Sequence, residues 1–192
     1  MKIIDYRNTK KPKISVIMSV YNNGNYLEQS IKSILNQKYK NLEFIIINDG
    51  STDNTEKIIR KYLKKKFNIL FINSKKNYGL PYMLNLGIKY SKGLYIARQD
   101  ADDISHKLRF SEQINFMKNN AKVDVLGTNA IQIYKSQKNK TNYTSNSKFI
   151  KNNLLNKNFL IHSSVIIKKS FFKKNGLYNI NYLRCQDYDL WL

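Results

Sequence analysis

Short apolar runs rich in Val and Ile alternate with segments of helical spacing along the first half of the chain. This alternation predicts parallel strands joined by helices, because two parallel neighbours need a long crossover connection between them. The predicted strands are residues 14–20, 44–47, 68–72 and 94–97. We therefore expect an α/β fold with a mainly parallel central sheet and helices on both faces.

Helix signals lie between the predicted strands. Apolar residues at helical spacing predict a first helix over about 27–37 and a third around 84–88. Asp53 and Glu56 have the spacing of a capping box. A second helix is therefore expected to open there and to run to about Phe67.

Polar loops follow three of the predicted strands, at 19–25, 49–53 and 98–103. The carboxyl ends of parallel strands meet at one edge of a sheet, and ligands bind outside that edge. We expect the three loops to converge there on one site. The sequence contains neither GxGxxG nor GxxxxGK[ST], which argues against a dinucleotide-dependent oxidoreductase and against a P-loop enzyme.

Three of the chain's 13 acidic residues are packed into the four positions from Asp100 to Asp103. Neighbouring carboxylates repel one another, so this cluster needs a cation or hydrogen-bond donors to stabilise it. A divalent metal that carries a phosphorylated ligand fits, because hard cations bind carboxylate and phosphate oxygens. In the alternative, Asp103 or Ser105 caps a helix that begins near Ser105, which explains one acid but not three.

The chain has 34 Lys and Arg residues and a formal net charge of +21. Four explanations stay open: an A/T-biased genome, nucleic acid, an anionic membrane surface and an anionic substrate. The cations gather in two clusters that lack zinc-finger spacing and an aromatic RNA-binding signature, and solvated helix faces account for both. The clusters are Lys57, Arg60, Lys61, Lys64, Lys65 and Lys66, and Lys168, Lys169, Lys173 and Lys174.

Cys185 is the one cysteine in the sequence, so no internal disulfide can form and a reducing cytoplasm fits. No apolar run approaches the roughly 20 residues of a membrane-spanning helix, and the N-terminus lacks the apolar core of a signal peptide. We expect a cytoplasmic protein whose basic faces are compatible with peripheral contact at an anionic membrane, on the inner face of the cell membrane.

Four segments, in this order, carry a resemblance to a known family. They are residues 14–22 (ISVIMSVYN), 47–55 (INDGSTDNT), 93–103 (GLYIARQDADD) and 186–191 (QDYDLW). With them the chain resembles the family 2 glycosyltransferases, which have the GT-A fold, use nucleotide-sugar donors and invert the anomeric centre. The resemblance implies a single domain over 1–192, with a nucleotide-sugar-binding half at about 12–104 and an acceptor-side half at about 105–192. Family members usually continue further, so we expect the chain to be truncated at its C-terminus.

The resemblance implies roles for residues that follow the predicted strands. Ser19 and Tyr21 would lie beside the nucleotide base, and Asp49 would accept a hydrogen bond from the base N3–H, which favours uracil. Asp100 would contact the ribose, and Asp102 would coordinate a divalent metal, Mn²⁺ or Mg²⁺, bound to the diphosphate. In the alternative for Asp49, the residue only forms an Asp-Gly turn.

Asp187 matches the family's catalytic position and would take the proton of the acceptor hydroxyl. Gln186 stands where the family often has Glu, which leaves that base intact. In the alternative, Asp187 and Asp189 are acids of an exposed first helical turn, where they favour the helix dipole. His162 is expected at the end of a strand. It either lies near the metal and diphosphate or is a hydrogen-bonded structural residue. Arg98 either contacts a phosphate or balances the nearby acids.

The family resemblance implies transfer of a sugar from a nucleoside diphosphate, with UDP the expected nucleotide, to an acceptor hydroxyl with inversion. The expected acceptor is a saccharide or a lipid-linked molecule, in the synthesis of surface polysaccharide or glycolipid. Two alternatives stay open. One is a basic nucleic-acid-binding module, and the other is a degenerate transferase fold that serves as a non-catalytic scaffold.

Overall fold

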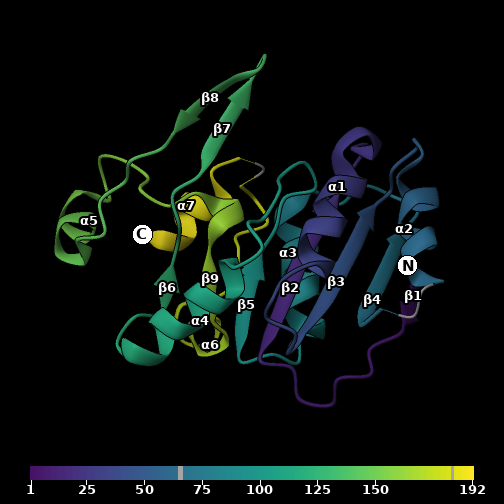
Figure 1. Cartoon of the computed structure of the whole chain (residues 1–192), viewed down its shortest axis with the longest axis horizontal. Helices are drawn as coiled ribbons and strands as arrows, with labels where there is room; N and C mark the ends of the chain where they lie inside the picture. Colours follow the sequence, from purple (N-terminus) through teal and green to yellow (C-terminus); the bar gives the residue numbers. More distant parts are fainter. Residues whose placement is uncertain (65–66, 183) are drawn as a thin grey trace.

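A computed structural model describes residues 1–64, 67–182 and 184–192 of the chain. Within these residues a seven-stranded sheet has the order β1-β4-β3-β2-β5-β9-β6 (Figure 1). Its strands are β1 (Lys2–Asp5), β2 (Ile14–Val20), β3 (Leu42–Asp49), β4 (Ile69–Ser74), β5 (Tyr95–Arg98), β6 (Val125–Leu126) and β9 (Ile166–Lys168). The four strands from β4 to β5 are parallel, whereas β1 and β9 pair antiparallel with their neighbours. The predicted, mainly parallel sheet is confirmed.

Helices cover both faces of this sheet. One face packs against α1 (Gly24–Leu35), α2 (Thr55–Leu63) and α4 (Arg109–Asn119). The other packs against α3 (Leu80–Tyr90), α6 (Lys169–Asn175) and α7 (Gln186–Trp191). Along β2, Val16 and Met18 point to the first layer and Ile17 to the second, as the period of two in a strand requires. Because both faces are covered, the central strands read as continuous apolar runs.

The second helix begins where it was predicted, at Thr55, but its predicted end and its predicted capping box are wrong. The second helix ends at Leu63 rather than near Phe67, and residues 65–66 lie outside the described residues. The predicted capping box is absent, because α2 has Asn54 as its N-cap and no side-chain cap bond. Asp53 instead accepts a hydrogen bond from the Thr55 amide at 3.0 Å, which forms a local turn just before the helix.

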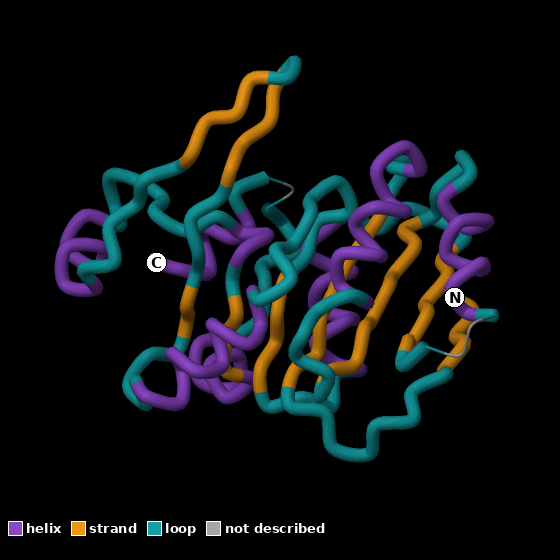
Figure 2. The backbone as a smooth tube through the Cα atoms, in the orientation of Figure 1, coloured by secondary structure: helices purple, strands orange, loops and turns teal. Residues whose placement is uncertain are grey.

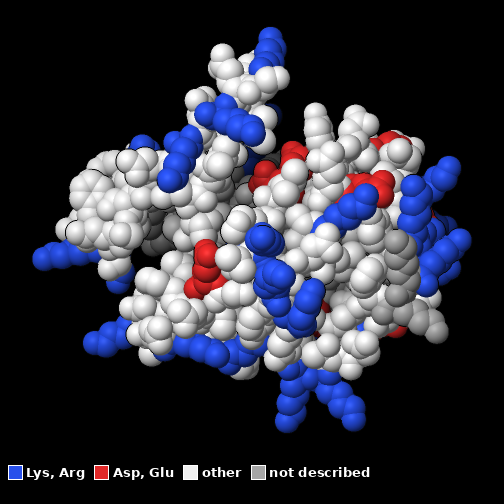
Figure 3. Space-filling view, in the orientation of Figure 1, with Lys and Arg blue, Asp and Glu red and all other residues white. Residues whose placement is uncertain are grey.

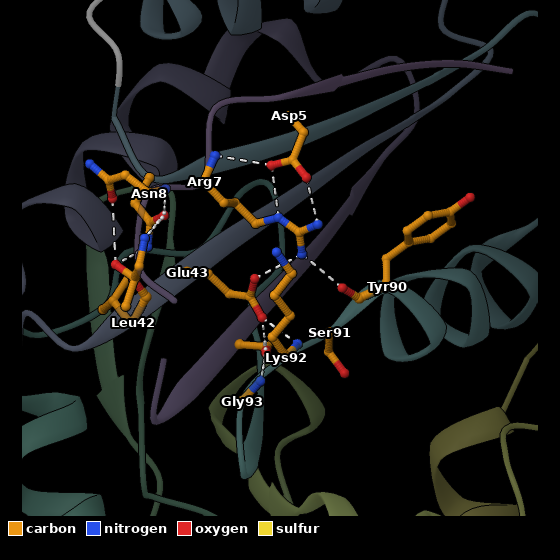
Figure 4. A network of polar contacts seen from close by, with 12 residues as sticks. Asp5, Arg7, Asn8, Leu42, Glu43, Tyr90, Ser91, Lys92 and Gly93 are labelled. Atoms are coloured by element: carbon orange, nitrogen blue, oxygen red, sulfur yellow. Dashed lines mark hydrogen bonds and ion pairs between the residues drawn. The ribbon is translucent and has the colours of Figure 1, made fainter. Parts of the chain in front are cut away.

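A buried charge network joins the amino ends of the central strands (Figure 4). Arg7 donates from Nη1 to Glu43 Oε2 at 2.9 Å and to the Tyr90 carbonyl at 2.8 Å. Glu43 Oε1 accepts from the Ser15 hydroxyl and from the Lys92 amide, both at 2.5 Å. The Glu43 side chain is fully buried, so these partners are what makes its charge tolerable there. The network fixes the end of the sheet opposite the site.

A separate hairpin, β7 (Ile131–Tyr134) and β8 (Gln137–Lys140), stands away from the sheet (Figure 2). Its two turn residues, Lys135 and Ser136, have φ of 44° and 70°, as a two-residue hairpin turn that matches the strand twist requires. A short helix, α5 (Ser147–Asn153), follows it. The sequence patterns predicted none of these elements. In the described part of the chain, no helix is both long and apolar enough to cross a membrane.

Candidate functional site

Three loops meet at the carboxyl edge of the parallel strands, as predicted. Hydrogen bonds join the first two loops: the Asn22 amide donates to Ser51 Oγ at 3.0 Å, and the Thr52 amide donates to Asn22 Oδ1 at 2.8 Å. The Gly24 amide donates to Asp53 Oδ2 at 2.9 Å. The loops after β2 and β3 are therefore one unit. Ser19 is half-buried near the carboxyl end of β2, just before the first of these loops. The side chain of Tyr21 is exposed, so a flat ring can stack on it.

Gly50 makes the turn after β3 possible. Its φ is +73°, and a Cβ at this position would lie 2.6 Å from the backbone carbonyl carbon of Lys76. No side chain fits so close to a backbone, so only glycine allows the β3 loop to pack against the segment that follows β4. This packing brings the segment after β4 to the same edge, in addition to the three predicted loops.

Asp49 lies at the end of β3, as predicted, and only 2% of it is exposed. Its Oδ1 accepts from the Tyr78 amide at 2.8 Å and its Oδ2 from the Gly79 amide at 2.9 Å. Desolvation raises the pKa of Asp49, and the two backbone donors act in the opposite direction. Asp49 thus holds the segment that leads into α3. Each carboxylate oxygen can accept a second bond, so contact with a base stays a prediction.

The loop after β5 is held by side chains from two helices. Ser30 of α1 donates to the Asp100 carbonyl at 2.8 Å, and Gln99 donates from Nε2 to the Asp103 carbonyl at 2.8 Å. Arg109 of α4 donates to Gln99 Oε1 at 3.0 Å. Burial lowers the pKa of the Arg109 guanidinium, whose donors all meet oxygen acceptors nearby. The sequence analysis missed Arg109, although an arginine on the apolar face of a helix was a usable signal.

Arg98 and Asp100 form an ion pair at the end of β5. The Arg98 side chain is 3% exposed and that of Asp100 is 37% exposed. Arg98 therefore balances a nearby acid, and its contact with a phosphate stays a prediction. The ion pair also orients the Asp100 carboxylate, since a guanidinium binds a carboxylate in a fixed direction.

The prediction that Asp103 caps a helix is wrong. The helix α4 begins several residues later, with Leu108 as its N-cap residue. The intervening segment is a turn, because the Gln99 side chain holds the Asp103 carbonyl. Desolvation raises the pKa of Asp103, a hydrogen bond with Ser163 lowers it, and the charges of Asp100 and Asp102 raise it further.

Among the described residues, no group of three or more His, Cys, Asp and Glu side chains lies close enough to hold a metal ion. Asp102 is exposed in the turn after β5, while Asp100 is engaged by Arg98. This donor set fits a hard divalent cation that takes one or two protein carboxylates and completes its shell with phosphate and water. It does not fit a cation held by protein side chains alone.

Asp187 lies in the first turn of α7 and is half-buried. Asn158 donates from Nδ2 to Asp187 Oδ2 at 3.1 Å. Gln186 beside it is buried. The first-turn position of this acid is confirmed, but the exposure that the alternative expected is not, because Asp187 is half-buried and hydrogen-bonded. The sequence analysis missed Asn158, because no local pattern marks a loop residue that contacts a helix far along the chain.

His162 lies in a short 3-10 helix, η1 (His162–Ser164), rather than at a strand end. Its Nε2 is 2.9 Å from the hydroxyl of Tyr178, and its ring lies edge-on to Trp191 of α7 at 6.3 Å. Desolvation lowers the pKa of His162 well below its usual value, and the charge of Arg98 acts in the same direction. His162 is therefore neutral near pH 7 and hydrogen-bonded within the protein.

Buried Tyr178 connects the end of β5 with the segment around His162, because it lines a small cavity with Arg98 and its hydroxyl lies 2.9 Å from His162 Nε2. Burial raises the pKa of Tyr178 above the usual value, and the charges of Arg98, Asp187 and Asp100 all act on it. The ring of His162 in turn contacts Trp191 of α7, the helix that carries Asp187. The structure thus brings the candidate base on α7 to the same region as the carboxylate after β5.

The fold of these elements is that of the GT-A glycosyltransferases. The chain aligns with S. aureus TarS in complex with UDP at a TM-score of 0.74 and 22% identity, over 93% of this chain and 53% of that one. It aligns with the mannosyltransferase PcManGT from Pyrobaculum calidifontis, in complex with GDP-Man and Mn²⁺, at a TM-score of 0.68 and 15% identity. That alignment covers 91% of this chain and 50% of the mannosyltransferase.

The sequence profile described as Glycosyl transferase family 2 matches residues 15–176, and the chain belongs to this family of enzymes. It is 34% identical to an uncharacterized glycosyltransferase of Methanocaldococcus jannaschii, over 95% of this chain and 64% of that protein. It is 42% identical to the putative glycosyltransferase EpsE of Bacillus subtilis, over 61% of this chain and 42% of EpsE. The chain thus spans less than two thirds of each of these relatives.

Proposed function

We propose that this protein transfers a sugar from a UDP-sugar to an acceptor hydroxyl with inversion of the anomeric centre. The observation that carries the proposal is the position of buried Tyr178. It lines a small cavity with Arg98, the partner of Asp100, and its hydroxyl lies 2.9 Å from His162, whose ring contacts Trp191 on the helix of Asp187. An inverting transfer needs a donor-binding carboxylate and a separate base within reach of one reacting carbon. Belonging to family 2 supports this enzyme over the nucleic-acid-binding module.

The nucleotide would bind over the joined loops after β2 and β3. Tyr21 and Ser19 lie beside that surface, and exposed Tyr21 offers a ring for the base. Asp49 would accept the N3–H of uracil through acceptor capacity that Tyr78 and Gly79 leave open. Asp100, oriented by its ion pair, would accept from a ribose hydroxyl. Solved GT-A proteins of similar fold hold UDP, UDP-GlcNAc and GDP-Man, which supports a nucleotide-sugar donor.

Asp102 would hold a divalent cation, Mn²⁺ or Mg²⁺, together with oxygens of the donor diphosphate. When bound, the cation supplies positive charge that stabilises the departing diphosphate. The complex of the Pyrobaculum mannosyltransferase with GDP-Man and Mn²⁺ supports the use of such a cation in this fold.

Asp187 would be the base. In the proposed step the acceptor oxygen bonds to the anomeric carbon, the bond from that carbon to the diphosphate breaks, and Asp187 takes the hydroxyl proton. Asn158 bonds one oxygen of this carboxylate, which leaves the second oxygen for the proton. The acceptor would be a saccharide or a lipid-linked molecule, in the synthesis of surface polysaccharide or glycolipid, as the family suggests.

Calorimetry with UDP, CDP and GDP, each with and without Mn²⁺, tests the donor site. We expect UDP to bind most tightly and to need the cation, and we expect Asp102→Asn to bind UDP weakly whether or not Mn²⁺ is present. A panel of UDP-sugars in an assay for released UDP then tests turnover. No binding of UDP in the presence of Mn²⁺ would contradict the donor assignment, whereas tight binding without turnover on any acceptor would favour the scaffold alternative.

A further inference from the structure

The β7–β8 hairpin exposes apolar side chains that no other described element covers. Ile131, Ile133 and Tyr134 are 62%, 66% and 69% exposed, and every residue from 131 to 140 is exposed. A two-stranded hairpin without a packed face is marginally stable in water. Exposed isoleucines on such an arm therefore indicate that a partner covers them.

The strand register divides the hairpin into two different faces. Ile131 pairs with Lys140, and Ile133 pairs with Lys138, so these four side chains share one face. The opposite face carries polar Gln and Asn side chains together with Tyr134. The hairpin therefore has one face on which two isoleucines alternate with two lysines, here called the Ile–Lys face.

The stem of the hairpin is well held despite the exposed face. The Ala130 amide donates to Thr141 Oγ1 at 2.8 Å, and the Thr141 amide donates back to the Ala130 carbonyl at 2.9 Å. Asn129 Oδ1 accepts from Thr141 Oγ1 at 2.9 Å and from the Tyr143 amide at 2.8 Å. The arm is therefore a defined projection, which presents the Ile–Lys face in one arrangement.

The arm and the stretch of sequence that contains it carry one sign of charge. Between Asp124 and Asp187 the sequence contains no Asp and no Glu. Lys135 in the turn adds a third cation to the hairpin. Figure 3 shows blue side chains along the projecting arm and no red one on it. A partner of the Ile–Lys face must accordingly be negative and must accept branched aliphatic groups.

We propose that the Ile–Lys face of the hairpin docks the protein on an anionic membrane surface. Isoleucine side chains enter the boundary between headgroups and acyl chains, and lysines bind lipid phosphates. Binding at a membrane surface combines these two contributions, buried apolar area and electrostatic attraction. A second copy of the chain is a poorer occupant, because its own lysines would repel these. Nucleic acid is also poorer, since aliphatic side chains offer a base no stacking surface.

The arm lies on the same side of the molecule as the candidate site. In Figure 1 it rises from the side of the sheet toward which the arrowheads of β2 and β3 point, which is the edge that holds the polar loops. Docking through the arm would therefore turn that edge toward the lipid surface. The proposal does not depend on the proposed transfer reaction, because membrane binding needs neither donor nor acceptor.

Co-sedimentation with vesicles tests the proposal, using phosphatidylcholine alone and mixed with phosphatidylglycerol. We expect binding to the anionic vesicles and at least about tenfold weaker binding to the neutral ones. Ile131→Ser with Ile133→Ser, and separately Lys138→Gln with Lys140→Gln, should each weaken anionic binding about tenfold or more. Ile133→Trp should show a blue shift of its fluorescence on adding anionic vesicles.

Matched controls separate the arm from bulk charge and bulk hydrophobicity. Lys57→Gln with Lys61→Gln removes the same charge from exposed positions of α2. Leu94→Ser with Ile180→Ser removes two apolar side chains that are 61% and 55% exposed elsewhere. We expect both controls to bind within about twofold of the unchanged protein, because neither touches the Ile–Lys face. Thermal unfolding of every variant checks that the sheet is intact.

Three results would overturn the proposal. One is an equal loss of binding in the α2 control, which would assign the effect to total charge. Another is unchanged vesicle binding in both hairpin variants. The third is a stable dimer in sedimentation experiments that the isoleucine substitutions dissociate, which would assign the face to a second copy of the chain.

Discussion

Asn158 donates a hydrogen bond from its side-chain amide to Oδ2 of Asp187 at 3.1 Å, across 29 positions of sequence. Asn158 lies in the segment between α5 and η1, whereas Asp187 lies in the first turn of α7. The bond fixes the direction of a carboxylate that the proposed mechanism uses as a base. It also ties that helix to the segment before His162, whose ring contacts Trp191 of the same helix.

Removing this bond should slow transfer more than it weakens donor binding. We expect Asn158→Ala to lower kcat about tenfold, because the carboxylate loses its orientation, and to leave the Kd for UDP within about twofold. Asp187→Asn should lower kcat by about 10²–10⁴, the usual contribution of a general base. Steady-state kinetics and calorimetry measure both quantities. As a matched control, Asn153→Ala on exposed α5 should change neither, and equal losses in kcat and in UDP affinity for Asn158→Ala would contradict a positioning role.

Asp49 should contribute to stability as well as to donor binding. Asp49→Asn places an NH₂ group opposite one of the backbone amides of Tyr78 and Gly79, which then has no acceptor. We expect a loss of about 1–3 kcal/mol in the free energy of unfolding, measured by urea denaturation. Asp53→Asn is the matched control, because exposed Asp53 also accepts from two backbone amides, those of Gly24 and Thr55. Water can replace the bonds of Asp53. A loss in the free energy of unfolding as large as that of Asp49→Asn would therefore contradict the claim that burial makes the Asp49 bonds important.

Gly50 and Gly176 offer a test of close packing at the site. Both have positive φ, +73° and +93°, so alanine is strained at either position. A Cβ on Gly50 would also meet the Lys76 backbone at 2.6 Å, whereas one on Gly176 would meet nothing within 4 Å. With ψ at 179°, Gly176 lies in a region that essentially only glycine adopts, so Gly176→Ala should cost about 1–3 kcal/mol of stability from strain alone. Gly50→Ala should cost more and should weaken UDP binding, and calorimetry that finds UDP affinity unchanged would contradict the assigned place of this loop.

His162 should make the protein less stable in mild acid. Its pKa in the folded state lies well below the value of about 6.5 that it has when unfolded. Below that value the unfolded chain binds a proton that the folded chain does not. Stability from this residue is thus complete above about pH 6.5 and falls as the pH drops, by up to about 1.4 kcal/mol per pH unit.

A variant isolates this effect. His162→Gln keeps a hydrogen-bonding group for the Tyr178 hydroxyl but cannot gain the proton. The fall in the free energy of unfolding between about pH 7.5 and about pH 5.5 should be smaller in the variant than in the unchanged protein. An identical pH dependence in the variant and the unchanged protein would show that His162 is not held neutral.

Local patterns in the sequence predicted the central architecture because they report burial directly. The runs that became β2, β3, β4 and β5 are mostly apolar and are buried at nearly every position, since both faces of the sheet are covered. Elements defined by pairing were missed. The strands β6 and β9 have two and three residues, and only their antiparallel contacts with each other and with β5 make them strands.

The sequence by itself determined that this is an α/β protein with acids and polar loops at the carboxyl ends of its strands. Its four family segments also pointed to the family that the comparisons confirm. Only the tertiary structure decided the state of each acid: Asp49 is bound to a loop, Asp100 to Arg98, and Asp102 is exposed. The reason is physical. A side chain's burial and its hydrogen-bond partners depend on residues far away in sequence, and no local pattern contains them.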